Sequence, residues 1–247
     1  VGGGAQDASE EVRRVAEILE APVCGFRLGR GVLDSRHHLS ITMPTGHRLW
    51  KDVDVVLGVG TRMQPHQQLW GTDKDLKIIR IDLSAEEMDR IVKPNVAIVA
   101  NAADALNSLA EALPKRNAAR TSRKEELDEA RAKTMEMLSP LAPQLAYIDA
   151  IRSALPEDGI FVEELTQVSY ISRLAMPVYK PRTFIASVFD SDTKMAPLLG
   201  ASLYASWDPE PQREMSPKPI GRNAEPKLHC RSRRGSAVPP VETETWL

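Results

Sequence analysis

Three largely continuous runs of apolar residues constrain the fold of this 247-residue chain more than any other feature. They occupy residues 53–59, 77–83 and 96–100. Continuous apolar strands, rather than strictly alternating ones, are typical of parallel sheets that helices cover on both faces. The sequence therefore predicts a doubly wound α/β domain over residues 1–113.

The opening VGGGAQD is typical of the last residue of a strand that enters a glycine turn. It predicts that this strand begins upstream of Val1, so that the domain is clipped at its N-terminus. Residues 7–21 then carry apolar positions at three- and four-residue spacing, which indicates a helix with Asp7 or Ser9 as its N-cap.

Helix signals also follow the apolar runs. Ser84 and Glu87 have the spacing of a capping box, and Asn101 can cap a helix that reaches residue 113. A short strand is expected over residues 22–26, followed by a loop rich in Gly, Arg and His. Each strand of the domain would thus be followed by its own helix.

Beyond residue 113 the pattern changes twice. Residues 114–142 are strongly charged and read as an interdomain linker that holds one helix, from Thr121 or Ser122 to residue 138. A second, partial α/β domain is expected over residues 143–187, with its elements at 143–155 (helix), 159–163 (strand), 166–175 (helix) and 183–186 (strand).

Residues 188–247 form a divergent tail. Seven of the chain's eighteen prolines lie within its last forty positions, where aliphatic residues are scarce. Such a segment buries too little apolar surface to offset its ordering entropy, which predicts disorder. The cluster of Arg231, Arg233 and Arg234 lacks interleaved aromatic residues, so a solvated tail is favoured over a nucleic-acid site.

Bulk properties exclude several classes of function. A net charge of −2 gives no field that would draw the chain to nucleic acid or to an anionic membrane, and no apolar run is long enough to span a bilayer. Cys24 and Cys230 are too few and too far apart for a disulfide framework or a zinc site, so a reducing, cytoplasmic location is expected.

Candidate binding residues gather after the first two apolar runs. Gly60, Thr61 and Arg62 follow one strand, at the carboxyl edge where doubly wound sheets bind ligands, and Arg62 could pair with a diphosphate. Asp82 closes the next strand and could accept ribose hydroxyls. The alternatives are a surface arginine after a glycine turn and an aspartate that caps the following helix.

The glycines at positions 2–4 have two interpretations as well. A glycine turn between a strand and a helix is where parallel α/β folds bind phosphate, yet the third small residue of the dinucleotide fingerprint is missing. A structural tight turn is an equal alternative.

The histidines do not predict a metal site. His37 and His38 are adjacent, and neighbouring side chains of a helix or strand point in different directions, while His47 and His66 have no acid–histidine spacing around them. Cys24 lies on an apolar strand and is expected in the core.

Five segments in order resemble the middle domain of thiamine-diphosphate enzymes of the acetolactate synthase, benzoylformate decarboxylase and oxalyl-CoA decarboxylase group: VGGGAQ (1–6), HHLSITMPTGH (37–47), DVDVVLGVGTRM (52–63), LKIIRIDLSAEEMDR (76–90) and VAIVANAADAL (96–106). DGIFVEELTQVSYISR (158–173) and YKPRTFIAS (179–187) resemble the opening of that group's C-terminal diphosphate-binding domain. The match stops abruptly after residue 187, which suggests that the tail is an aberrant end rather than family sequence.

The resemblance implies an enzyme of three α/β domains that uses thiamine diphosphate and Mg²⁺ and acts on a small-molecule 2-keto acid as a homodimer or homotetramer. In such relatives the first domain supplies an activating glutamate, and a GDG motif binds the metal and the diphosphate. No GDG occurs in the 247 residues.

Residue by residue, little of the family's cofactor chemistry carries over. Gln167 matches a position near the cofactor diphosphate, whereas Arg62 and Asp82 match the flavin-contacting stretches of relatives that hold FAD. The histidine-glycine-threonine pattern of those flavin relatives is not reproduced around Gly46 and His47, which argues against FAD.

The leading hypothesis is a fragment of a thiamine-diphosphate-dependent 2-keto acid decarboxylase or carboligase, inactive alone and without a catalytic residue of its own. The alternative is a nucleotide- or FAD-binding module without catalysis. A sirtuin-like deacylase is a weaker third, since paired CxxC zinc ligands are absent.

Overall fold

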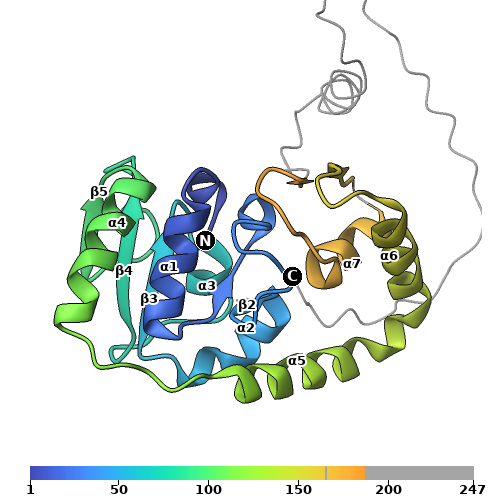
Figure 1. Cartoon of the computed structure of the whole chain (residues 1–247), viewed down its shortest axis with the longest axis horizontal. Helices are drawn as coiled ribbons and strands as arrows, with labels where there is room; N and C mark the ends of the chain where they lie inside the picture. Colours follow the sequence, from blue (N-terminus) through green and yellow to red (C-terminus); the bar gives the residue numbers. More distant parts are fainter. Residues whose placement is uncertain (165, 187–247) are drawn as a thin grey trace, which may run out of the picture. The chain divides into compact units, whose positions relative to one another are not determined.

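A computed structural model describes residues 1–164 and 166–186 of the chain (Figure 1). The predicted disorder of residues 188–247, the origin of that tail and its arginine cluster therefore lie outside the described residues. Over the described ranges, no helix combines the length and the apolar character that crossing a membrane requires.

A three-stranded parallel sheet forms the centre of the first half. Its strands are β3 (Val55–Val59), β4 (Lys77–Asp82) and β5 (Val96–Val99), in the order β3-β4-β5. Val55 lies opposite Lys77, and Ile79 lies opposite Val96. The three apolar runs are thus strands, as predicted, with ends that shift by at most two residues.

A second parallel pair, β1 (Val23–Cys24) with β2 (Ser40–Ile41), connects to this sheet through the first residues of the chain. The Val1 amine donates to the Cys24 carbonyl over 2.8 Å, and the Gly2 amide donates to the Val59 carbonyl over 3.1 Å. Backbone bonding therefore runs from β2 to β5 by way of Val1 and Gly2. The predicted α/β fold with parallel strands is confirmed.

Helices α1 (Ser9–Leu19) and α4 (Ala102–Ala112) pack against each other on one face of the sheet (Figure 1). Their shared core consists of the following buried residues: Ala5, Ala8, Val12, Val15, Val32, Val59, Ile81, Ala102, Leu106 and Ala110. Asn101 caps α4 as predicted, because its side chain accepts from the Ala103 amide over 2.9 Å.

The predicted N-cap of α1 is wrong. Ala8 occupies that position and makes no side-chain cap bond. Ser9 instead donates from its hydroxyl to the Val32 carbonyl over 2.6 Å, and the Asp7 carboxylate pairs with Arg182 at 2.6 Å. Both polar side chains are used by long-range contacts that the local sequence does not reveal.

The predicted helix after β4 is also absent. The Glu87 amide does donate to the Ser84 hydroxyl over 3.4 Å, but residues 84–92 form turns. The guanidinium of Arg80, which is 1 % exposed, donates to the carbonyls of Glu87 and Met88 over 2.5 and 3.0 Å. A helix would need those carbonyls for its own ladder, so the buried arginine holds the segment in another shape.

The expected loop after β1 contains regular structure as well. Besides β2 it includes α2 (Met43–Leu49), and α3 (Gln64–Gln68) follows β3. Gly46 lowers the helix propensity of this short element, whereas Pro44 lies in its first turn, where proline is tolerated. Short 3₁₀ turns complete the chain: η1 (Gly3–Ala5), η2 (Arg27–Gly29), η3 (Trp50–Asp52), η4 (Leu113–Lys115) and η5 (Ser139–Leu141).

The charged linker carries the predicted helix, α5 (Lys124–Leu138), and packs against α2. Leu127 is fully buried in a cluster with Leu39 and Ile41, and the Thr45 hydroxyl donates to that of Thr134 over 3.1 Å. One face of this helix is therefore part of the core, although its composition suggested a solvated connector.

Residues 142–186 form the smaller α/β unit. Helices α6 (Ala142–Ala154) and α7 (Gln167–Ala175) pack together, and β6 (Phe161–Val162) pairs in parallel with β7 (Phe184–Ile185). Element types and order agree with the prediction, although both strands are shorter than expected.

Arg30 joins this unit to the first half of the chain. Its guanidinium donates to the carbonyls of Ser172, Arg173 and Met176 at the carboxyl end of α7, and it lies 4.8 Å from the centre of the Phe184 ring. Burial lowers the pKa of Arg30 to about 10. A cation at a helix C-terminus is favoured by the helix dipole, so this contact is well placed to hold the two halves together.

Candidate functional site

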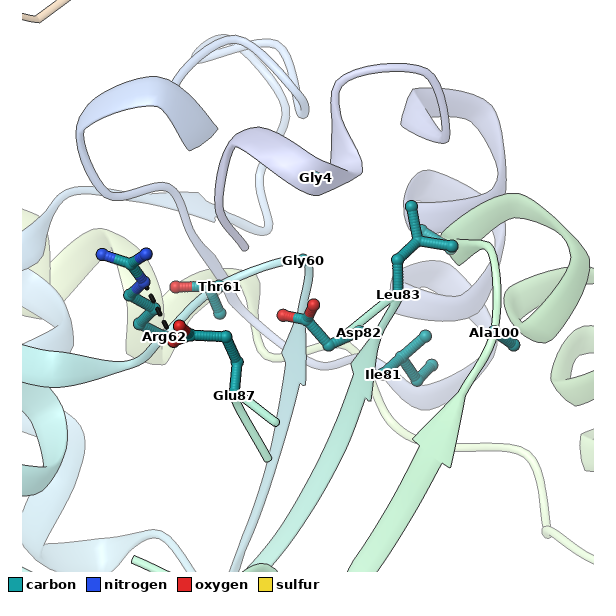
Figure 2. A pocket seen from close by; sticks show the side chains of 10 residues that line it. Gly4, Gly60, Thr61, Arg62, Ile81, Asp82, Leu83, Glu87 and Ala100 are labelled. Carbon is teal, nitrogen blue, oxygen red and sulfur yellow. Dashed lines mark ion pairs between the residues drawn. The ribbon is translucent and has the colours of Figure 1, made fainter. Parts of the chain in front are cut away.

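A pocket of about 250 Å³ opens at the carboxyl ends of β3 and β4 (Figure 2). Four of the five predicted site residues, Gly60, Thr61, Arg62 and Asp82, line it. Gly4, which the sequence analysis considered within a possible phosphate-binding turn, also lines it. The sequence reasoning missed the other lining residues: Ile81, Leu83, Glu87, Ala100 and Ala102. Since the carboxyl ends of parallel strands meet at one edge, Ala100 after β5 could have been anticipated beside Asp82.

Glycine is required where the N-terminal turn meets the end of β3. Gly60 has φ +54°, and a Cβ atom there would lie 2.4 Å from the backbone carbon of Gly4. The amides of Gly2 and Gly4 donate to the carbonyls of Val59 and Gly60 over 3.1 and 3.0 Å. These donors are already used, so the structural interpretation of the opening glycines is favoured over a phosphate cradle.

Arg62 lies at the rim of the pocket and is exposed. Its Nε is 3.1 Å from Oε2 of Glu87, and Figure 2 shows this pair reaching across one side of the opening. An arginine that already has a carboxylate partner can accept an anionic ligand only by sharing or exchanging that partner. Arg62 is therefore a surface arginine that lies at the pocket rim, where it could contact a ligand once Glu87 shares it.

Asp82 projects its carboxylate into the pocket beneath Gly60, between Thr61 and Leu83 (Figure 2). One carboxylate oxygen accepts from the Ser84 amide over 3.1 Å, and the other is 3.7 Å from Nη2 of the buried Arg80. The alternative role of capping a following helix is wrong, because turns follow β4. The carboxylate retains acceptor capacity toward the pocket.

Leu83 gives the pocket an apolar wall. Its side chain is 71 % exposed although it directly follows a buried strand. Ala100, on the same side of the pocket as Leu83 in Figure 2, and Ala102 add small side chains to the lining, and Ala102 begins α4. The pocket therefore combines two carboxylates (Asp82 and Glu87), one arginine, a helix N-terminus and an apolar surface.

Gln167, the fifth predicted residue, is not brought together with the other four. It is the first residue of α7, exposed, and its Oε1 accepts from Gln144 Nε2 over 3.5 Å. Thr166 caps this helix by accepting from the Ser169 amide. Nothing in the pocket of Figure 2 comes from this half of the chain.

The histidines and Cys24 lie outside this pocket. His37 and His38 are stacked, with ring centres 4.8 Å apart, which corrects the expectation of diverging side chains; they lie in a turn, where that rule does not hold. Burial raises the pKa of the Cys24 thiol to about 11, in agreement with a core role. Within the described ranges no three His, Cys, Asp or Glu side chains gather to hold a metal ion.

His66 belongs to an aromatic cluster in which its ring centre lies 4.3 Å from that of Trp70 and 5.8 Å from that of Trp50. Burial lowers its pKa from 6.5 to about 4. The unfolded chain therefore binds a proton between these pH values while the folded chain does not, so stability falls as pH falls from about 6.5 to 4.

We expect the unfolding free energy to drop by about 2 kcal/mol more between pH 7 and pH 5 in the wild type than in His66→Phe. Urea unfolding followed by tryptophan fluorescence at the two pH values measures this difference. Equal losses in both proteins would contradict the burial of an uncharged imidazole.

Comparison with known proteins assigns the first half of the chain. Residues 1–109 match the family described as "Thiamine pyrophosphate enzyme, central domain". These residues are a thiamine pyrophosphate enzyme central domain. The pocket at the ends of β3 and β4 thus belongs to this central domain.

Individual relatives are distant. A probable acetolactate synthase large subunit of Methanocaldococcus jannaschii is 31% identical over 124 residues, which are 45% of this chain and 21% of the relative. The 2-hydroxyacyl-CoA lyase of Arabidopsis thaliana is 26% identical over 204 residues, 74% of this chain and 34% of the relative. The acetolactate synthase isozyme 1 large subunit of Escherichia coli is 25% identical over 200 residues, which are 76% of this chain and 35% of the relative.

The matched part thus spans between a fifth and about a third of these relatives' length. All three alignments are longer than the central-domain match over residues 1–109, and two of them cover 74% and 76% of this chain, so similarity reaches beyond residue 109. The resemblance noted from the sequence is confirmed at the level of the central domain and of distant homology to acetolactate synthase large subunits.

Proposed function

We propose that this chain is part of a thiamine-diphosphate- and Mg²⁺-dependent enzyme that decarboxylates a 2-keto acid or joins two such molecules. The central-domain match over residues 1–109 carries the proposal, and the longer alignments to relatives named acetolactate synthase and 2-hydroxyacyl-CoA lyase support it. A homo-oligomeric, cytoplasmic enzyme with a small-molecule substrate belongs to the same proposal.

The residues described here do not fit thiamine diphosphate and Mg²⁺. Mg²⁺ prefers a set of oxygen ligands at near-octahedral geometry, and no cluster of acidic side chains in the described ranges offers one. Gln167 lies exposed, with Gln144 as its contact. We therefore derive no catalytic step from this chain and assign it no catalytic residue.

Calorimetry with thiamine diphosphate and Mg²⁺ tests this division of roles. We expect the isolated chain to show no binding tighter than about 10 μM, which corresponds to roughly −7 kcal/mol. Tighter binding would show that the residues of this chain suffice to hold the cofactor.

Sequencing the gene on both sides of the segment tests the family proposal itself. We expect an upstream domain with the activating glutamate and a GDG motif downstream. Flanking sequence without either feature would contradict the assignment to a working thiamine-diphosphate enzyme.

A second candidate function is carried by the pocket geometry. We infer that it binds the nucleoside part of a nucleotide such as ADP or FAD, with Asp82 accepting ribose hydroxyls and Leu83 contacting the base. Ligand pockets usually measure about 300–1,000 Å³, so a volume of about 250 Å³ suits a nucleoside better than a whole dinucleotide.

Calorimetry with ADP and with FAD tests the second candidate. Asp82→Asn should weaken the binding of either ligand about tenfold or more, because it removes a charged acceptor for two hydroxyls. Asp104→Asn, which changes an exposed carboxylate outside this pocket, is the matched control and should bind as the wild type does. The nucleoside-binding candidate is contradicted if neither ADP nor FAD binds the wild type, or if Asp82→Asn binds them as tightly as the wild type does.

A further inference from the structure

Strand β5 is the last strand of the β3-β4-β5 sheet in the described part of the chain. Val96 and Val99 are 47% and 55% exposed, unlike the buried residues of β4. In a parallel strand, alternate residues direct their backbone groups to opposite sides, and β4 takes one set, for example the bond from the Asn95 amide to the Ile78 carbonyl. The amides and carbonyls of Val96 and Ile98 face the open edge.

An apolar groove of about 450 Å³ runs beside this edge, between β5 and α4. It is lined by Ile98, Ala100, Asp104, Ala105, Ser108 and Leu109. Figure 1 shows β5 and α4 together at the outer side of the β3-β4-β5 sheet, away from β2. Exposed apolar side chains on a strand with free backbone groups are a template for pairing with another strand.

Charges at the two ends of β5 indicate which strand. Lys93 precedes β5 and Asp104 follows it, both side chains are exposed, and neither has an ion-pair partner among the described residues. A second β5 that runs antiparallel would bring each lysine toward the aspartate of the other copy. A parallel neighbour would instead place like charges together.

We propose that β5 pairs with β5 of a second copy of this chain, antiparallel about a two-fold axis at Ala97. Val96 then lies opposite Ile98 of the second copy, so that the free backbone groups of both strands bond to each other. The two grooves along α4 lie on the same face of the joined sheet, on either side of the two-fold axis, so that each copy covers part of the groove of the other. The interface is isologous, as expected for a two-fold dimer.

Sedimentation equilibrium of the 247-residue chain tests this interface. We expect a dimer for the wild type and a monomer for Val96→Asp, which places a charge at the centre of the strand pair. Leu69→Asp is the matched control, because Leu69 is 60% exposed at the end of α3, and it should remain dimeric. A wild type that stays monomeric up to about 200 μM overturns the proposal, because a dimer with a dissociation constant of about that value would already be detected. A Val96→Asp protein that dimerises like the wild type also overturns it.

A charge exchange then tests the antiparallel register. Lys93→Glu and Asp104→Lys should each raise the dimer dissociation constant about tenfold, because two symmetry-related pairs become like-charged. The double variant restores opposite charges and should return to within about threefold of the wild type. A double variant that is as weak as or weaker than the singles contradicts the register.

Discussion

Replacing Arg30 with methionine should destabilise the chain by about 3–5 kcal/mol, because a buried guanidinium that donates three hydrogen bonds to backbone carbonyls is lost. Methionine keeps the apolar stem but removes the guanidinium that donates to the carbonyls of Ser172, Arg173 and Met176, of which Ser172 still accepts from the Met176 amide over 3.1 Å. Buried carbonyls without a partner cost about 1–3 kcal/mol each before relaxation. Urea unfolding followed by circular dichroism measures the change.

Arg13→Met is the matched control for this experiment. Arg13 is an exposed arginine of α1 whose partners, Glu10 and Glu17, are also exposed. Its replacement should leave the unfolding midpoint almost unchanged. If Arg30→Met behaves like Arg13→Met, Arg30 does not hold the smaller α/β unit to the first half of the chain.

Arg80→Met should have an effect of similar size, again about 3–5 kcal/mol. The Arg80 side chain is 1% exposed and donates to the carbonyls of Thr61, Glu87 and Met88. Its loss would release residues 84–92 from the sheet and disturb the pocket wall formed by Thr61 and Glu87. Arg80→Lys should lose less, because lysine keeps the charge although it cannot reach all three carbonyls.

Arg90→Met controls for the loss of an arginine in the same segment. Arg90 is exposed and pairs with Glu87 over 2.8 Å. We expect urea unfolding to show little change in the stability of Arg90→Met, and limited proteolysis to cut residues 84–92 as slowly as in the wild type. Equal effects of Arg80→Met and Arg90→Met would contradict the role assigned to the buried guanidinium.

Local sequence was sufficient for elements that depend on local physics. The apolar runs identified the strands β3, β4 and β5. The expected burial on both faces applies best to β4, whereas Val96 and Val99 of β5 are exposed. Asn101 identified the start of α4, because a cap is a contact within three residues.

Elements fixed by distant contacts could not be predicted in this way. Ser84 and Glu87 carried a valid capping signal, yet Arg80 takes the carbonyls that the helix would have used. Ser9 carried another, and its hydroxyl bonds to Val32 instead. In both cases a long-range hydrogen bond outweighed a local preference of about 1 kcal/mol.

The candidate site shows the same division. Gly60, Thr61, Arg62 and Asp82 were found because parallel strands direct their carboxyl ends to one edge. Glu87 was missed, since only the fold of residues 84–92 brings it to Arg62. Gln167 came from resemblance alone, and its position on α7 is separate from the pocket.

The central claim is that residues 1–109 form a folded central domain around the β3-β4-β5 sheet, with residues 142–186 packed onto it through Arg30. Native-state hydrogen exchange of the whole chain tests this most directly. We predict the slowest amides within β3 and β4, at residues 55–59 and 77–82, and measurable protection of the amides of Phe161 and Glu163, which donate to carbonyls of Thr183 and Ile185. Fast exchange in both β3 and β4 would contradict the claim.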